Sequence, residues 1–179
     1  MLKKLALLST LCLSLPVSYA DNLAPYVGAG LGVQVNTASS GSNYRGVPFN
    51  VLAGYGGVIN QNFYLAGEFN ATLFNAEMNN NYGNIKTSYS YGLSAIPGLM
   101  LSDHTMLFGR AGLLQSRFST NTSRTGGVLG LGLQTLLTQD VDIRGEYNYV
   151  SFGSFTNNAR YYGAPRSDIF NLSLIYKFQ

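Results

Sequence analysis

Residues 26–36 read YVGAGLGVQVN, and this stretch decides the fold. Every second residue in it is apolar, with glycine or glutamine between; the apolar set is Val27, Ala29, Leu31, Val33 and Val35. Because the side chains of a β-strand point alternately to its two faces, a period of two predicts a strand. One face of that strand is apolar, and the other carries small and polar side chains.

The same alternation recurs along the rest of the chain, in stretches bounded by clusters of Asn, Gly, Ser, Thr and Asp. Including the first, the predicted strands are 26–36, 49–57, 63–74, 88–101, 106–116, 128–137, 141–152 and 168–178. The links between them alternate in length. Long polar links cover 37–46, 75–87, 117–127 and 153–167, and short ones lie around 60–62, 102–104 and 138–140. Long external loops that alternate with short periplasmic turns are typical of outer-membrane barrels.

The charged residues of the predicted strands share a face with glycine, serine and asparagine. They are Glu68, Arg110, Arg144, Glu146 and Lys177. A soluble eight-stranded barrel of the lipocalin type has the opposite sorting, with an apolar interior and a charged exterior. Charged residues make up 11% of the chain, against about 25% in ordinary soluble domains. Lipid is therefore expected to cover the apolar face.

A sheet that spans hydrocarbon must close on itself, because every backbone polar group there needs a partner. The predicted fold class is therefore all-β, an eight-stranded antiparallel up-and-down transmembrane β-barrel in the cell outer membrane. Side chains can just fill the interior of a barrel of this size, so an open diffusion pore is not expected.

The N-terminus has the layout of a cleavable secretion signal: Lys3 and Lys4, an apolar run over 5–15, and small residues at Ser18 and Ala20. We expect residues 1–20 to be a signal peptide and 21–179 to be the barrel domain. The lone Cys12 lies in the signal, so the mature domain is expected to have no disulfide and no cysteine chemistry. The remaining charges nearly balance, and nucleic acid is not an expected partner.

Several short motifs carry a family resemblance: YVGAGLG at 26–32, RAGL at 110–113, LGLQ at 131–134 and IRGEY at 143–147. Together they resemble the opacity-like family of outer-membrane β-barrel surface proteins, with OmpA and OmpX as more distant relatives. The resemblance covers essentially the whole mature chain. It implies a surface protein with structural roles, and with adhesive or host-interacting roles carried by variable loops.

The last predicted strand resembles the signal that the barrel-assembly machinery recognises, so that machinery is an expected partner. The residues concerned are Asn171, Ser173, Tyr176 and Phe178. Ser173 stands where the signal often has glycine, and Gln179 follows the aromatic residue that usually ends the chain.

Two sets of charged residues are candidate functional groups. Glu68, Arg110, Arg144 and Glu146 each lie about four to six residues from a short turn, so they are expected to form one layer across the lumen. Buried charges are costly unless they are paired. The main interpretation is an ion-pair plug that rigidifies the barrel; a gated ion path is the alternative.

The second set is a basic collar in the long links: Arg45, Lys86, Arg117, Arg124, Arg160 and Arg166, against the single acidic Glu77. The opposite end is acidic, with Asp21, Asp103, Asp140 and Asp142. Arginine pairs well with phosphate. We therefore expect the collar to contact lipopolysaccharide phosphates, beside the surrounding membrane lipid, or host surface molecules that are anionic. Ordinary solvated loop charge explains the same residues equally well.

Other features do not indicate an enzyme, a cofactor or a metal. The glycines of 28–32 lack the following helix and acidic residue of a nucleotide-binding loop. His104 is the sole histidine, in a periplasmic turn, at the wrong end for a hydrolase base acting on lipid A. A narrow small-solute channel (porin-like) and an outer-leaflet lipid-modifying enzyme remain alternatives to the surface protein.

Aromatic residues near the strand ends are expected to form girdles at the two membrane interfaces. The candidates are Tyr26, Phe63, Tyr64, Tyr89, Tyr147, Tyr149, Tyr176 and Phe178. Pro97 interrupts the fourth predicted strand and removes a ladder hydrogen bond, which is tolerable near the periplasmic end.

Overall fold

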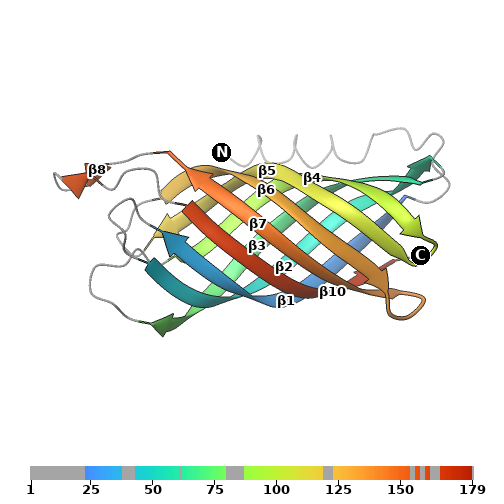
Figure 1. Ribbon diagram of the computed structural model, residues 1–179, viewed down its shortest axis with the longest axis horizontal. Coiled ribbons are helices and arrows are strands. Elements are labelled where there is room, and N and C mark those ends of the chain that lie inside the picture. Colours follow the sequence, from blue (N-terminus) through green and yellow to red (C-terminus); the bar gives the residue numbers. More distant parts are fainter. Residues whose placement is uncertain are drawn as a thin grey trace, which may run out of the picture.

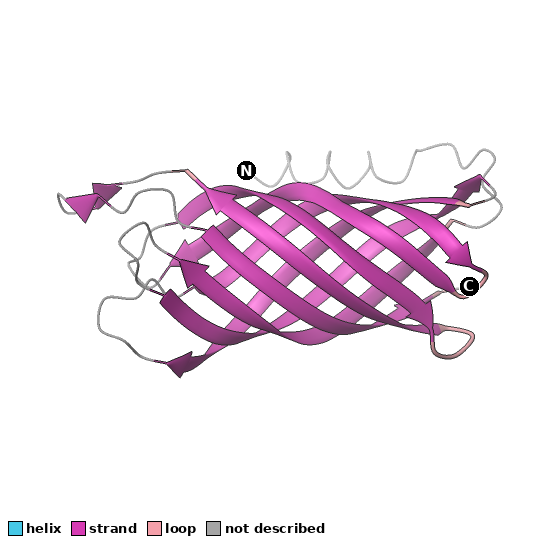
Figure 2. Cartoon of the chain, in the orientation of Figure 1, coloured by secondary structure: helices cyan, strands magenta, loops and turns pink. Residues whose placement is uncertain are grey.

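The computed structural model describes residues 23–37, 43–60, 62–79, 87–118, 123–153, 156–157, 160–161 and 166–178. These ranges form strands and turns (Figures 1 and 2). The long strands are β1 (Ala24–Thr37), β2 (Asn43–Asn60), β3 (Phe63–Asn79), β4 (Thr87–Ser102), β5 (Thr105–Phe118), β6 (Ser123–Leu136), β7 (Val141–Phe152) and β10 (Arg166–Lys177). Within the described ranges, no helix is long and apolar enough to cross a membrane.

The eight long strands close into one barrel in the order β1-β10-β7-β6-β5-β4-β3-β2. Each strand pairs antiparallel with its neighbours along the chain, and β1 pairs with β10 to close the cylinder. The predicted eight-stranded antiparallel up-and-down barrel is thus confirmed. Its short turns lie at one end, called here the short-turn end, and the long links lie at the other, the long-link end (Figure 1).

The strands run further toward the long-link end than the sequence predicts. β2 begins at Asn43 rather than at 49, β3 ends at Asn79 rather than at 74, and β6 begins at Ser123 rather than at 128. The polar residues there have the composition of loops. They nevertheless stay in the ladder, because their backbones pair with neighbouring strands, as Arg45 does with Val35.

Two further short strands, β8 (Thr156–Asn157) and β9 (Arg160–Tyr161), form a small hairpin in the last long link.

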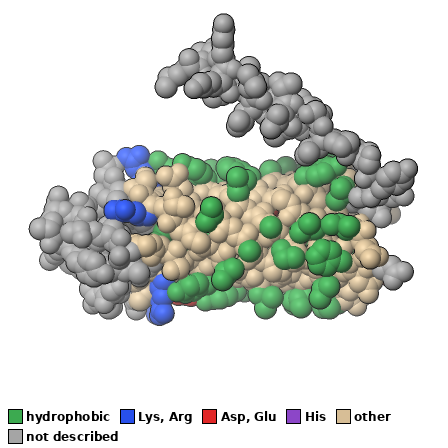
Figure 3. Space-filling model, turned by 90° about the horizontal axis from the view of Figure 1, so that it is seen from above, with side chains coloured by type: hydrophobic (Ala, Val, Ile, Leu, Met, Phe, Trp, Pro, Cys, Tyr) green, Lys and Arg blue, Asp and Glu red, His purple; other side chains and the backbone are tan. Residues whose placement is uncertain are grey.

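The outer wall of the barrel is apolar, as the alternation predicts. Leu93, Leu113 and Leu129 are each about two-thirds exposed on it. Figure 3 shows apolar side chains over the visible wall and basic side chains toward the long-link end. This arrangement is stable in lipid and unfavourable in water, because a soluble protein rarely exposes so large an apolar surface.

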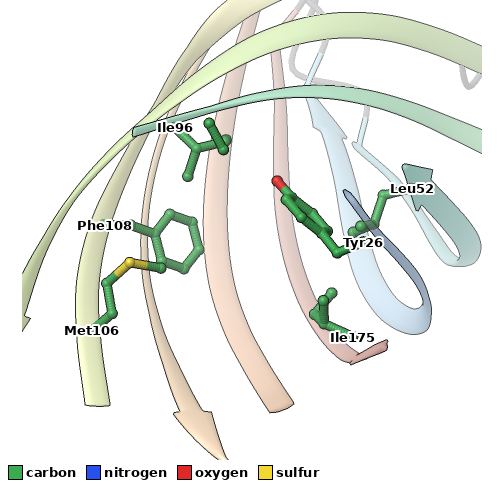
Figure 4. Packing of buried hydrophobic residues seen from close by; sticks show 7 residues of the cluster. Tyr26, Leu52, Ile96, Met106, Phe108 and Ile175 are labelled. Carbon is green, nitrogen blue, oxygen red and sulfur yellow. The ribbon is translucent and has the colours of Figure 1, made fainter. Parts of the chain in front are cut away.

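The lumen also contains two apolar clusters that sequence reasoning missed. Near the short-turn end, Tyr26, Leu52, Ile96, Met106, Phe108 and Ile175 converge from several strands (Figure 4). Toward the long-link end, Leu114, Val128, Val150 and Phe152 pack together. These residues occupy inward positions among glycines and polar residues. Because the same face also carries the charged residues, the sequence pattern predicts a polar lumen and does not reveal these clusters.

A β-bulge in β3 changes which residues face the lumen. Phe49 pairs with Phe74 but Asn50 pairs with Thr72, so Leu73 has no opposite residue. Leu73 and Phe74 are both exposed on the outer wall, and Asn75 is buried inside. The rings of Phe49 and Phe74 stack on the wall with centroids 5.3 Å apart. The extra residue of a bulge shifts the alternation by one, and this shift brings Asn75 into the lumen.

Candidate functional site: charged lumen and basic rim

Glu68, Arg110, Arg144 and Glu146 lie together in the lumen, in contact across the barrel. Glu68 accepts from both arginines: Arg110 Nη2 lies 2.5 Å from Oε1, and Arg144 Nη1 lies 2.5 Å from Oε2. Arg110 Nη2 also lies 2.9 Å from Glu146 Oε2. All four side chains are buried, so each charge depends on its neighbours rather than on water. We call these four residues the charge layer.

Aromatic side chains surround the charge layer on its short-turn side. Tyr26 Oη donates to Glu68 Oε2 at 3.0 Å. The guanidinium of Arg144 lies over the rings of Tyr26 and Phe108, with its Cζ 5.5 and 5.0 Å from the ring centroids. Cation–π contact of this kind helps to stabilise a desolvated arginine.

The assignment of Tyr26 and Tyr64 to an outer aromatic girdle is therefore wrong. Tyr26 is buried in the lumen, and Tyr64 packs against the inner apolar cluster. Both stand on the inward parity of their strands, alternating with exposed Val27 and Leu65. The alternation of inward and outward residues along each strand was the signal in the sequence that could have assigned both tyrosines to the lumen. Tyr89, Tyr147, Tyr149 and Tyr176 do lie exposed on the wall.

A hydrogen-bonded chain extends from the charge layer to the short-turn end. Arg144 Nε donates to Gln134 Oε1 at 2.8 Å, and Gln134 Nε2 donates to Asp142 Oδ2 at 2.5 Å. Lys177 Nζ then lies 3.0 Å from Asp142 Oδ1 at the mouth. With this pair included, the lumen network has three cations and three carboxylates, and its formal charges cancel.

In the other direction, amides connect the charge layer to the middle of the barrel. Asn148 Nδ2 and Asn171 Nδ2 both donate to Glu146 Oε1, at 3.0 and 3.4 Å. Asn50 Nδ2 donates to Asn171 Oδ1, and Thr72 Oγ1 donates to Asn50 Oδ1. A cavity of about 30 Å³ lies among these side chains, room for about one water molecule. Side chains therefore fill the lumen at this level.

Nearer the long-link end, a second polar network contains no charged group. Gln34 Nε2 donates to Asn36 Oδ1 at 2.8 Å and to Thr87 Oγ1 at 3.2 Å. Asn75 Nδ2 donates to Gln34 Oε1 at 2.8 Å, and Ser167 Oγ donates to Asn36 Oδ1 at 2.5 Å. We call these five residues the amide network. It was not predicted from the sequence, since its members come from four strands and one of them, Asn75, depends on the bulge.

The residues of the predicted basic collar do not form one ring of loop side chains. Arg45, Arg117, Arg124 and Arg166 lie in strands β2, β5, β6 and β10, not in loops. Arg45 and Arg166 are exposed on either side of β1, where they pair with Val35 and Thr37. Arg117 lies on β5, on another part of the wall, with its Cζ 5.9 Å from the Tyr89 ring centroid.

Arg124 differs from these three because it alternates with buried Gly126 and Val128, which places it on the lumen side of the mouth. Arg160 belongs to β9, whose side chains lie outside the described set, and Lys86 lies outside the described residues. The four described arginines are thus spread around the rim of the long-link end.

The residues of the predicted assembly signal all lie on β10 or directly after it. Asn171 and Ser173 are buried in the lumen, and Tyr176 and Phe178 are exposed at the short-turn end. The rings of Tyr176 and Phe178 meet edge to face, with centroids 5.0 Å apart. The predicted signal peptide, including Cys12, lies outside the described residues.

His104 is exposed in the turn between β4 and β5. Its backbone N–H lies 3.4 Å from Ser102 Oγ, and its carbonyl accepts from Thr135 Oγ1 at 3.2 Å. Among the described residues, no group of three or more His, Cys, Asp or Glu side chains could hold a metal ion.

Comparison with known proteins agrees with this architecture. Residues 5–178 match the family described as outer membrane protein beta-barrel domain. Ail, the attachment invasion locus protein of Yersinia pestis, is 16% identical with a TM-score of 0.54, over 89% of this chain and 100% of Ail. Neisserial surface protein A is 21% identical with a TM-score of 0.58, over 88% of this chain and 100% of that protein.

Ail has also been solved in complex with the heparin analogue sucrose octasulfate. That structure is 18% identical to this chain with a TM-score of 0.56, over 88% of this chain and 99% of Ail. At these identities the similarity extends to the fold. No curated protein sequence matches the chain.

Proposed function

This chain belongs to the outer membrane protein beta-barrel domain family, and we propose that within it the chain is a surface protein with a filled lumen that binds anionic groups through its long-link end. The primary ligand is the phosphate of lipopolysaccharide in the surrounding outer leaflet. Adhesion to sulfated or phosphorylated molecules of a host surface is the second role of the same rim.

The observation that carries this proposal is the position of three arginines on the outer wall. Arg45, Arg117 and Arg166 all stand at the long-link ends of their strands, where the apolar wall gives way to polar residues. Arg117 Nη1 donates to Tyr89 Oη at 3.2 Å, so an interfacial tyrosine positions it. Arginine presents several N–H groups in a plane that matches a phosphate. Lipid phosphates lie at the level of such aromatic side chains.

The filled lumen supports a surface role over transport. The charge layer and the two apolar clusters occupy the bore with buried side chains. A barrel of this kind can contact other molecules through its ends and its wall, and its loops are free to vary. The proposed orientation puts the short turns in the periplasm.

A triple variant tests the proposal: Arg45→Gln, Arg117→Gln and Arg166→Gln together. Three exposed contacts of about 0.5 kcal/mol each sum to about 1.5 kcal/mol, so the affinity for lipopolysaccharide in nanodiscs should fall about tenfold. Lys177→Gln removes one cation from the opposite end and should leave that affinity unchanged. Equal binding by the triple variant and the wild type would refute the proposal.

The second role has its own measurement. Cells that display the triple variant should bind less sucrose octasulfate and less sulfated polysaccharide than cells that display the wild type. If lipopolysaccharide binding falls while sulfated ligands bind equally well, the rim serves the membrane alone.

A narrow channel for small solutes is a second candidate function. The observation in its favour is the polar chain that runs from Lys177 at the mouth through the charge layer to Thr72. Single-channel recording in planar bilayers decides between the two. Discrete conductance steps in the wild type that change in Arg110→Ala would establish the channel.

A further inference from the structure

Between the register shifts near its two ends, the ladder between β4 and β5 has an interruption. The paired residues run from Tyr91 and Gln115 to Ala95 and Ala111, then resume at Gly98 and Phe108. Ile96 and Pro97 have no partner on β5. On the other side of β4 the register is unbroken, and Pro97 pairs with Leu65 of β3. The missing N–H of Pro97 therefore faces β5, where proline cannot donate to the ladder.

The residue that faces this interruption on β5 is Gly109. A Cβ added to it would meet nothing nearer than Pro97 Cγ at 3.8 Å. Gly109 stands at an outward position, between inward Phe108 and Arg110. Because Gly109 has no side chain, the wall opens there into a hollow of about 290 Å³. Its lining is apolar and includes Phe63, Pro97, Leu99, Leu107, Gly109 and Leu131.

The depth of the hollow places it within one half of the membrane. Gly109 lies four residues after the first residue of β5, Thr105, at the short-turn end, which is about 13 Å along the strand. Because the strands of such barrels tilt by about 40° from the axis, this is about 10 Å along the barrel axis. The apolar band of such barrels is about 25 Å tall. The hollow therefore opens into the leaflet on the short-turn side. Leu99 and Leu131, on its two sides, are both more than half exposed to that leaflet.

We propose that this hollow is a binding site for one acyl chain of a phospholipid from the leaflet on the short-turn side. A void in an apolar wall loses dispersion contacts unless something fills it. A flexible hydrocarbon chain can fill it without a polar partner, and the membrane around the wall supplies such chains. Pro97 and Gly109 then act together: proline leaves the ladder incomplete, and glycine leaves the space.

The site can be observed directly in the wild-type protein. Perdeuterated protein in nanodiscs of protonated phosphatidylethanolamine should give NOE cross-peaks from acyl methylene protons to the Gly109 amide. Gly145 is the matched reference, because it is also an outward glycine, and a Cβ added to it would meet nothing within 4 Å. It lies four residues after the start of β7, so its depth is similar. Stronger cross-peaks at Gly109 than at Gly145 are expected, and equal intensities would overturn the proposal.

Two variants test the same site from the protein side. Gly109→Leu fills the hollow and should weaken the cross-peaks between acyl chains and the Leu131 methyl groups, selectively protonated for this experiment, whereas Gly145→Leu should leave their intensity unchanged. Pro97→Val restores the N–H that the ladder lacks and should weaken the same cross-peaks, because a complete ladder holds β4 and β5 more tightly beside the hollow. If the Leu131 cross-peaks in Gly109→Leu are as intense as in the wild type, no chain occupies the hollow. If Gly109→Leu does not fold, Pro97→Val and the comparison of Gly109 with Gly145 in the wild type still test whether a chain occupies the hollow.

Discussion

The two halves of the lumen solve the problem of buried polarity in different ways. Toward the short-turn end, the network depends on full charges: Glu68 between two arginines, and Arg110 between two carboxylates. Toward the long-link end, the amide network depends on neutral groups such as Gln34 and Asn36, next to the apolar cluster of Val150 and Phe152. Both networks close the bore, although a cavity of about 210 Å³ remains at the short-turn mouth. The free-energy cost of losing one partner differs between the two halves.

This difference shows where the barrel is vulnerable. A buried charge that loses its partner keeps its full desolvation penalty, whereas a neutral amide that loses one hydrogen bond costs far less. The charge layer is therefore the part of the lumen where one substitution should matter most. Four substitutions, compared by urea unfolding in lipid vesicles, test whether the two halves differ in this way.

Arg110→Ala should have the largest effect. Arg110 alone contacts both carboxylates, so its loss leaves Glu146 without a cation. Removing one partner of a buried pair costs about 3–5 kcal/mol, and the free energy of unfolding should fall by that amount. The double variant Arg110→Met with Glu146→Met removes charge in balance and should recover part of the loss. An unchanged unfolding midpoint for Arg110→Ala would contradict a stabilising role for the charge layer.

Arg144→Met should have the second largest effect. Glu68 keeps Arg110 and Tyr26 as partners, and methionine can retain the apolar contact with Phe108. The expected loss is that of a hydrogen bond to a charged group, about 1.5–3 kcal/mol. A loss greater than that of Arg110→Ala would mean that Arg144, not Arg110, is the centre of the layer.

Gln34→Ala breaks the amide network and should cost about 1–2 kcal/mol, the value of one or two neutral hydrogen bonds. Asn36 and Thr87 keep the hydrogen bond between them, whereas Asn75 loses its bond to Gln34. The barrel should still assemble and run as a folded band in unheated gels. A loss as large as that of Arg110→Ala would remove the contrast between the two halves.

Lys177→Met should have the smallest effect, about 0.2–1 kcal/mol. The Lys177 side chain is one-third exposed at the mouth, and Asp142 retains Gln134 as a donor. Salt should screen most of this contribution, so the difference from the wild type should shrink in concentrated sodium chloride. A salt-independent loss of several kcal/mol would show that the pair of Lys177 and Asp142 stabilises the barrel as a buried ion pair does.

Alternation in the sequence was sufficient to predict the barrel, because each strand presents one face to lipid and one to the lumen. It placed Leu31, Leu113 and Leu172 on the wall, where they are exposed. The same rule predicted that Glu68 and Arg110 would point inward. The order of the strands also follows from the sequence, because a short turn can join only two strands that lie side by side. The long strands therefore pair with their neighbours along the chain, and the first and last strands close the cylinder.

The details of the lumen depended on features that periodicity does not contain. The distance of each residue from a short turn predicts that Glu68 and Arg144 share one layer, but the stagger between strands decides which of their atoms meet across the barrel. The bulge at Leu73 moves Asn75 inward. The strand extensions that carry Arg45 and Arg117 have the composition of loops, so sequence reasoning placed these residues in loops.

The seam between β1 and β10 has a consequence for biogenesis. These strands are the first and last of the barrel, and they pair from Tyr26 with Lys177 to Thr37 with Arg166. Beyond the ladder, the Phe178 N–H donates to the Pro25 carbonyl at 3.0 Å. The edge of β1 that pairs with β10 therefore stays without its partner until β10 has been synthesised. Unpaired edges promote aggregation, so this edge of β1 is exposed to wrong pairing from its synthesis until the barrel closes.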